Sequence, residues 1–171
     1  MGTKKGGACI EVARQNSDMS IDNVTKFYTG TSCILGVIEY IQSILESENI
    51  TDHHAKIPYI FRALHGLAEH RNIILITMEW ITKQMNCEDM TVIESLTSYK
   101  FIPKTMESIS MLVQKYYITN DVNILHHVVT KLESQFENEK KTLKSFVDSS
   151  FAYYKKYNGY DEYVKRLNGA G

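Results

Sequence analysis

The sequence is poor in the residues that interrupt helices or crosslink chains. It has two prolines, nine glycines and three cysteines among 171 residues. Both prolines, Pro58 and Pro103, precede apolar periodic stretches, and a first helical turn tolerates proline because its N–H is unpaired there. The cysteines are odd in number and share no metal-type spacing, which favours a reducing compartment over a disulfide framework. The expected location is therefore the cytoplasm.

Long apolar runs and catalytic loops are also missing. The most apolar run covers residues 73–78, far shorter than the ~20 residues that a membrane span requires. The formal net charge of −1 does not favour nucleic acid or an acidic membrane as a partner. No glycine-rich loop leads into a helix, and no Ser or Cys sits in a nucleophile elbow. We expect no enzymatic activity, no cofactor, and membrane contact only if the chain continues beyond residue 171 into a tail.

Six histidines raise the question of a metal site. His65 and Glu69 lie four residues apart, on one face of an expected helix. The doublets His53-His54 and His126-His127 have members that point about 100° apart on a helix. A di-iron bundle needs Glu-x-x-His sets from several helices, and this chain supplies one weak pair. The sequence therefore predicts no metal site.

What the chain does contain is helical periodicity. Apolar residues recur every three or four positions, without a useful run of two-residue alternation. With 43% hydrophobic and 23% charged residues, the chain is expected to be globular, and its length suggests one domain. We predict an all-α bundle of seven to eight helices over residues 21–171, preceded by a flexible N-terminus over residues 1–20. The expected helices cover about 31–48, 58–85, 91–99, 103–117, 122–136 and 142–156, with a loop at 51–54, a bend at 137–141 and a short helix after Gly159.

Three stretches are apolar on more than one side, namely 73–81, 109–118 and 124–132. A helix that is apolar most of the way round must be surrounded by other helices. We therefore predict that the 122–136 helix is the central one. Its expected core residues are Ile124, Leu125, Val128, Val129 and Leu132.

The tail segment Asn158-Gly159-Tyr160-Asp161-Glu162-Tyr163-Val164 resembles the second homology region of the Bcl apoptosis-regulator family. In that family a helix ends in Asn-Gly-Gly-Trp, followed by an acid and an aromatic residue; here one Gly is dropped and Tyr stands for Trp. Asn120-Asp121-Val122-Asn123 keeps the Asn of the family's Asn-Trp-Gly-Arg. The 103–117 and 91–99 stretches look like the family's fourth and third helices. The resemblance covers roughly residues 31–167, and each motif in it is degenerate.

This resemblance implies a Bcl-like fold around a central apolar helix. It also implies an inhibitor of apoptosis that binds amphipathic death-motif (BH3-type) helices of pro-apoptotic proteins, such as Bak, Bax and Bim, in a hydrophobic groove. The eroded motifs, in a chain rich in Ile, Lys, Asn and Tyr, resemble viral members of the family, which implies a host–virus interaction and a place at the mitochondrial surface. The expected partner-binding residues are Ile109, Leu112, Val113, Tyr116, Asn120, Val122, Asn123, Tyr160 and Tyr163.

Two departures from the family pattern favour a second hypothesis. Val122 and Asn123 replace the Gly and the Arg of Asn-Trp-Gly-Arg. The bidentate contact between that Arg and a ligand carboxylate is therefore lost, and bulk is added where the ligand helix should approach closely. The second hypothesis is an all-helical adaptor or immune-modulating scaffold with a closed groove, which acts through homodimerisation or surface contacts. Access to the groove separates the two hypotheses.

Overall fold

The computed structural model describes residues 30–46 and 50–157. These residues form one short 3-10 helix, η1 (Gly30–Ser32), and five α-helices. The α-helices are α2 (Cys33–Leu45), α3 (Ile50–Gln84), α4 (Met90–Tyr99), α5 (Phe101–Thr119) and α6 (Val122–Tyr157). No strand occurs in the two described ranges, so the prediction of an all-α fold is confirmed. The predicted boundary between residues 20 and 21 lies outside them.

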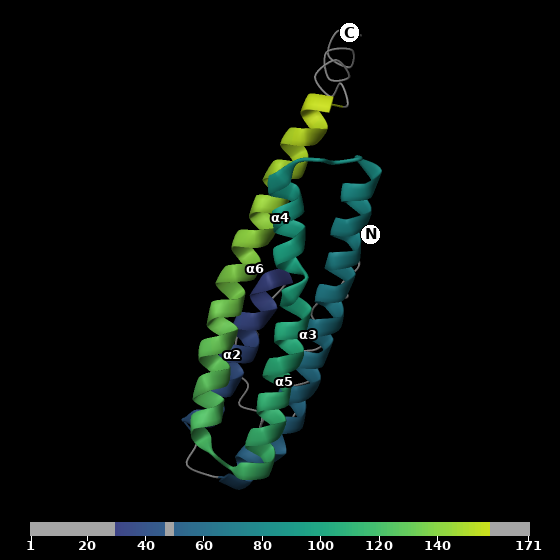
Figure 1. Ribbon diagram of the computed structural model, residues 1–171. Helices are drawn as coiled ribbons and strands as arrows, with labels where there is room; N and C mark the ends of the chain where they lie inside the picture. The colour runs from purple at the N-terminus through teal and green to yellow at the C-terminus, as the bar shows by residue number, and fades with distance from the viewer. Residues whose placement is uncertain (1–29, 47–49, 158–171) are drawn as a thin grey trace, which may run out of the picture.

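The helices form an elongated four-cornered bundle (Figure 1). The long helices α3 and α6 occupy opposite corners, and α2 and α5 each pack against both of them from the two other corners. Helix α4 continues the line of α5 and packs against α6 and, less extensively, α3. We call the half that contains α2 and α5 the lower half, and the half that contains α4 the upper half. Helix α2 is short and lies beside the lower half (Figure 1).

Several predicted boundaries are wrong. Helix α6 runs without interruption through the predicted bend at 137–141, because Glu139 within it is buried and paired rather than solvated. Helix α3 includes the predicted loop at 51–54 and carries Pro58 inside it. An interior proline removes one helical hydrogen bond at a cost of about 3 kcal/mol, which the packing of α3 offsets. The described residues form five α-helices, so the predicted count of seven to eight is not confirmed.

Helices α4 and α5 are separated by a single residue. Lys100 keeps right-handed helical angles, with φ −55° and ψ −25°. Pro103 cannot donate to the carbonyl of Tyr99, and its ring crowds that carbonyl, which explains the break between the two helices. The helix predicted from Pro103 onward therefore begins two residues earlier, at Phe101.

The five predicted core residues of the 122–136 stretch are all buried, as expected. The prediction that this helix is central is wrong. His126 and His127 are exposed, so α6 occupies one corner of the bundle and buries only its inner face. The predicted apolar positions are the buried ones, but polar positions between them are exposed, as in a helix with one solvated side.

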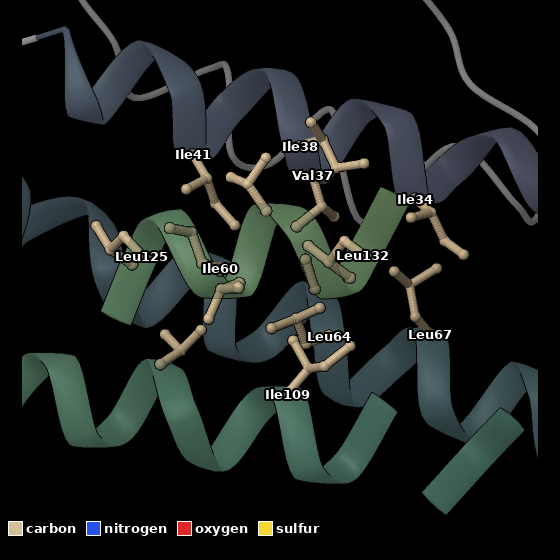
Figure 2. Close-up of a cluster of buried hydrophobic side chains, with 14 of the residues drawn as sticks. Ile34, Val37, Ile38, Ile41, Ile60, Leu64, Leu67, Ile109, Leu125 and Leu132 are labelled. Carbon is tan, nitrogen blue, oxygen red and sulfur yellow. The ribbon is translucent and has the colours of Figure 1, made fainter. Parts of the chain in front are cut away.

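The lower half has the larger apolar core. Helix α2 points its apolar face at α3 and α6, and α5 closes the cluster from the opposite side (Figure 2). The labelled members are Ile34, Val37, Ile38, Ile41, Ile60, Leu64, Leu67, Ile109, Leu125 and Leu132. Each such side chain contributes roughly 1.5–3 kcal/mol relative to exposure. A smaller cluster in the upper half joins α3, α4 and α6 and contains no residue of α2.

The start of α4 yields a first testable prediction. Asp89 caps this helix, and its Oδ1 accepts hydrogen bonds from the N–H groups of Thr91 (2.9 Å) and Val92 (3.3 Å). Asp89→Ala is expected to lower the free energy of unfolding by about 1 kcal/mol, because two helical N–H groups lose their acceptor. Urea denaturation should show a lower midpoint at unchanged slope. Asp89→Asn is the matched control and should keep most of the stability; equal loss in both variants would contradict a capping role.

Candidate interaction surface

The predicted groove residues of α5 lie in the core. Ile109, Val113 and Tyr116 are buried in the lower cluster, and Leu112 packs against it partly buried. The Tyr116 hydroxyl is hydrogen-bonded to Nδ1 of His53 at 2.8 Å. The structure brings these four α5 residues together, but as packing between α5 and its neighbours. In this arrangement Ile109, Val113 and Tyr116 belong to the core, and Leu112 remains partly exposed.

Three more predicted site residues build the turn between α5 and α6. Asn120 ends α5 in the left-handed conformation, with φ 55°, which Asn tolerates better than most residues. Its side chain is also hydrogen-bonded to the ring of His54. Asp121 Oδ1 accepts from the backbone N–H of Asn123 (3.1 Å) and from its side-chain amide (3.0 Å). Val122 is exposed beside them. The remaining two predicted residues, at positions 160 and 163, lie outside the described residues.

An exposed apolar stripe that the sequence reasoning did not assign to a site lies on the upper half of α3. Ile73, Ile76 and Trp80 are 61%, 64% and 60% exposed, and we call them the α3 stripe. Their spacing of three and four places them on one helix face. The buried Arg71 and Met78 each lie two residues before a stripe residue, about 200° away around the helix. The α3 stripe therefore faces away from the core.

The outer face of α3 changes character along its length. In the lower half it carries exposed Arg62, His65 and Glu69. Beyond Glu69, the outward-facing residues of the α3 stripe are large and apolar. Lys83, seven residues after Ile76, is again charged and exposed. The sequence contains a sign of this apolar outer face, because the 73–81 stretch is apolar on more than one side. That pattern was read as a central helix, whereas here the second apolar side meets solvent.

A second exposed stripe lies on the upper half of α6. Val147, Phe151 and Tyr154 are exposed and spaced four and three apart, and we call them the α6 stripe. Lys155 lies over the ring of Phe151, with its Nζ 4.6 Å from the ring centroid. This spacing is visible in the sequence, and could have been singled out there. The sequence analysis predicts a helix over 142–156 but assigns no binding role to these three residues.

A polar layer separates the two apolar clusters. The buried Arg71 and Glu139 form an ion pair with Nε 3.1 Å from Oε1, and the Tyr99 hydroxyl donates to the same Oε1 at 3.1 Å. Burial, together with the Glu139 charge, raises the pKa of Tyr99 well above its usual range, so this hydroxyl remains a donor. Nη2 of Arg71 has no hydrogen-bond partner within the described part of the chain. Sequence reasoning missed this layer.

The described residues contain no group of three or more His, Cys, Asp or Glu side chains that could hold a metal ion. The predicted weak pair, His65 and Glu69, meets at 3.5 Å on the exposed face of α3. Within 30–46 and 50–157, no helix has both the length and the apolar composition that crossing a bilayer requires.

Comparison with known proteins finds no matching family model, no matching curated protein and no matching solved structure.

Proposed function

We propose that this protein acts by binding other proteins rather than by catalysis, and that the α3 stripe captures an amphipathic helix. One observation carries the proposal: Ile73, Ile76 and Trp80 give α3 a second apolar face, which points away from its own core. A partner helix with apolar residues at i, i+3, i+4 and i+7 has the spacing to pack along such a face. Tryptophan is also among the residues most enriched at the energetic centres of interfaces.

The charges at the two ends of the α3 stripe specify the partner further. Glu69 and Lys83 lie seven residues before and after Ile76 on the same outer face, and both are exposed. A partner helix with a basic residue at one end and an acidic residue at the other would complement them. Such complementarity mainly fixes orientation and register, while the apolar contacts provide most of the affinity.

The resemblance to the Bcl family suggests which helices these are. Its ligands are death-motif helices, with the apolar spacing described above and an Asp that pairs with a cation of the binding protein. Lys83 supplies such a cation at the end of the α3 stripe. The proposal therefore includes a Bcl-like inhibitor of apoptosis that acts on pro-apoptotic proteins at the mitochondrial surface. The proposed contact lies on α3, whereas the resemblance placed it on α5, on the turn and helix start at residues 120–123, and on Tyr160 and Tyr163.

Isothermal titration of the full chain with death-motif peptides of about 26 residues tests this function. We expect a micromolar or tighter Kd for at least one peptide, about −8 kcal/mol or better. Trp80→Ala should weaken that binding by about 30-fold, the effect of losing an interface hot spot. The matched control is Ile118→Ala, because Ile118 is exposed at the lower end of the bundle. If no peptide binds while the protein is folded, capture of death-motif helices is refuted.

A second candidate function is that of an adaptor that dimerises through the same stripe. Two observations favour it: three of the four predicted groove residues of α5 are buried, and the α3 stripe is nearly symmetric about Ile76. In an antiparallel pair of copies, Trp80 of each chain would meet Ile73 of the other, as a two-fold interface requires. Light scattering across protein concentrations would then show a doubled mass, lost in Trp80→Ala. A monomer at all concentrations would remove this candidate.

A further inference from the structure

The outer face of α3 has the residue spacing of a helix that pairs with another helix. Five exposed residues follow one another at intervals of four, three, four and three positions: Glu69, Ile73, Ile76, Trp80 and Lys83. These are the intervals of the a and d positions in a coiled coil, which keep the side chains in one row along a partner helix. We call these five residues the α3 seam, and the α3 stripe is its apolar centre.

The α3 seam is accessible from outside the bundle, because α3 occupies a corner (Figure 1). The charge nearest to its centre, Glu79, is turned toward the α4–α5 joint, where its Oε1 lies 3.4 Å from Lys100 Nζ. The hydroxyl of Thr77, beside the stripe, donates to the carbonyl of Ile73 at 2.9 Å. These two polar groups are therefore already bound within the chain, and the centre of the seam offers mainly apolar surface.

The α3 seam is complementary to itself when a second copy runs in the opposite direction. Glu69 and Lys83 each lie seven residues from Ile76. In an antiparallel pair centred on Ile76, Glu69 of each copy therefore comes level with Lys83 of the other. A parallel pair would instead place like charges against each other at both ends, which is unfavourable. The charges thus select the antiparallel arrangement and its register.

We propose that the α3 seam pairs with the same seam of a second copy of the chain, antiparallel and in this charge-matched register. The inference rests on the proposed function, since it names a partner for the α3 stripe. Helix α3 itself meets the description of the partner helix: it has apolar residues at i, i+3 and i+7, an acid at one end and a base at the other. Ile76 then lies near the two-fold axis, and each Trp80 packs against Ile73 of the other copy.

The size of the α3 seam indicates a weak and reversible pair. It is about 21 Å long and offers five residues a side, against roughly 20–30 in a stable interface. A second copy would cover the same side chains that a captured helix contacts. Self-pairing and helix capture therefore exclude each other, and pairing lowers the fraction of chains that are competent to bind. Capture would then weaken as the concentration of the protein rises.

Exchanging the charges of the seam tests the proposal. Sedimentation equilibrium of the full chain between about 10 µM and about 1 mM should show the mass rising toward that of two chains. Glu69→Lys leaves two basic ends and Lys83→Glu two acidic ends, so each variant should associate more than about tenfold more weakly. The matched control is Lys115→Glu, which makes the same change of charge at an exposed position of α5 and should associate like the parent.

Two rescue experiments separate the charge register from a general loss of association. The double variant Glu69→Lys/Lys83→Glu should regain the association of the parent, because opposite charges face each other again. An equimolar mixture of the two single variants should form a mixed dimer for the same reason. Trp80 is the only tryptophan of the chain, so its fluorescence reports whether the stripe is covered. Its emission should shift to shorter wavelength as the dimer forms, and circular dichroism checks the helix content of each variant.

Three results would overturn the proposal. A parent chain that stays monomeric, with unshifted Trp80 emission, would mean that the seam does not pair with itself. A dimer that persists in both single variants would use another surface. Association that is lost in them but not recovered in the mixture would mean that Glu69 and Lys83 do not face each other.

The outcome for helix capture is read separately from the outcome for self-pairing. A peptide panel without binding, together with a dimer that follows the charge pattern, would refute the capture of death-motif helices and support self-pairing. A peptide that binds a chain that never dimerises would do the reverse. A peptide that binds while the dimer persists would overturn the shared use of the α3 stripe.

Discussion

Arg71→Met is expected to lower the free energy of unfolding by about 3–5 kcal/mol, because it leaves the Glu139 carboxylate buried without its cation. Both side chains are almost fully buried, at 1% and 0% exposure, so water cannot replace the lost partner. The Tyr99 hydroxyl still donates to Glu139, but one neutral donor does not compensate a buried charge. The variant should show a much lower urea midpoint than the parent chain.

The double variant Arg71→Met/Glu139→Leu separates two contributions to the free energy of unfolding: the net stabilisation by the ion pair, and the destabilisation caused by one unpaired buried charge. Replacing both charges with apolar residues of similar volume is often neutral or stabilising, so most of the lost stability should return. Tyr99→Phe in the parent chain should cost less than Arg71→Met, about 1–3 kcal/mol, because it removes a single hydrogen bond. A double variant as unstable as Arg71→Met would show that the polar layer is needed for more than charge neutralisation.

The fold class could be predicted from the sequence because apolar spacing is a local signal. The five predicted apolar positions of the 122–136 stretch follow directly from its period, and all five are in the core. Helix boundaries were less accurate, because charged and histidine-rich segments were read as solvated breaks. Glu139 shows why: its partner Arg71 is 68 residues away in the chain, and only the fold brings the two together.

The candidate site was harder to predict than the fold. Apolar residues on two sides of a helix mean burial if neighbours cover both sides, and an interaction surface if one side is left open. The 109–118 stretch was assigned to a groove, yet Ile109 and Val113 are core residues. The 73–81 stretch was assigned to the core, yet Trp80 is exposed. Only the placement of the neighbouring helices distinguishes these two cases.

Ile41→Ala is expected to lower the free energy of unfolding by about 2–5 kcal/mol, the cost of a large cavity in a packed core. Ile41 is fully buried where α2 meets α3 and α6 (Figure 2). Because α2 has only thirteen residues, its attachment depends on the few side chains of its apolar face. Ile118→Ala is the matched control: Ile118 is 78% exposed, so its truncation should change stability by less than about 0.5 kcal/mol.

Hydrogen exchange in Ile41→Ala also tests whether the two halves of the bundle open separately. The upper cluster contains Met78 and Phe146 but no residue of α2, and the polar layer lies between it and the lower cluster. Exchange should therefore accelerate in α2 and in the parts of α3 and α6 that it covers, before it does so in α4. Equal acceleration in α4 would mean that α3 and α6, which run through both halves, couple them into one cooperative unit. In that case the polar layer would separate the clusters in space but not in stability.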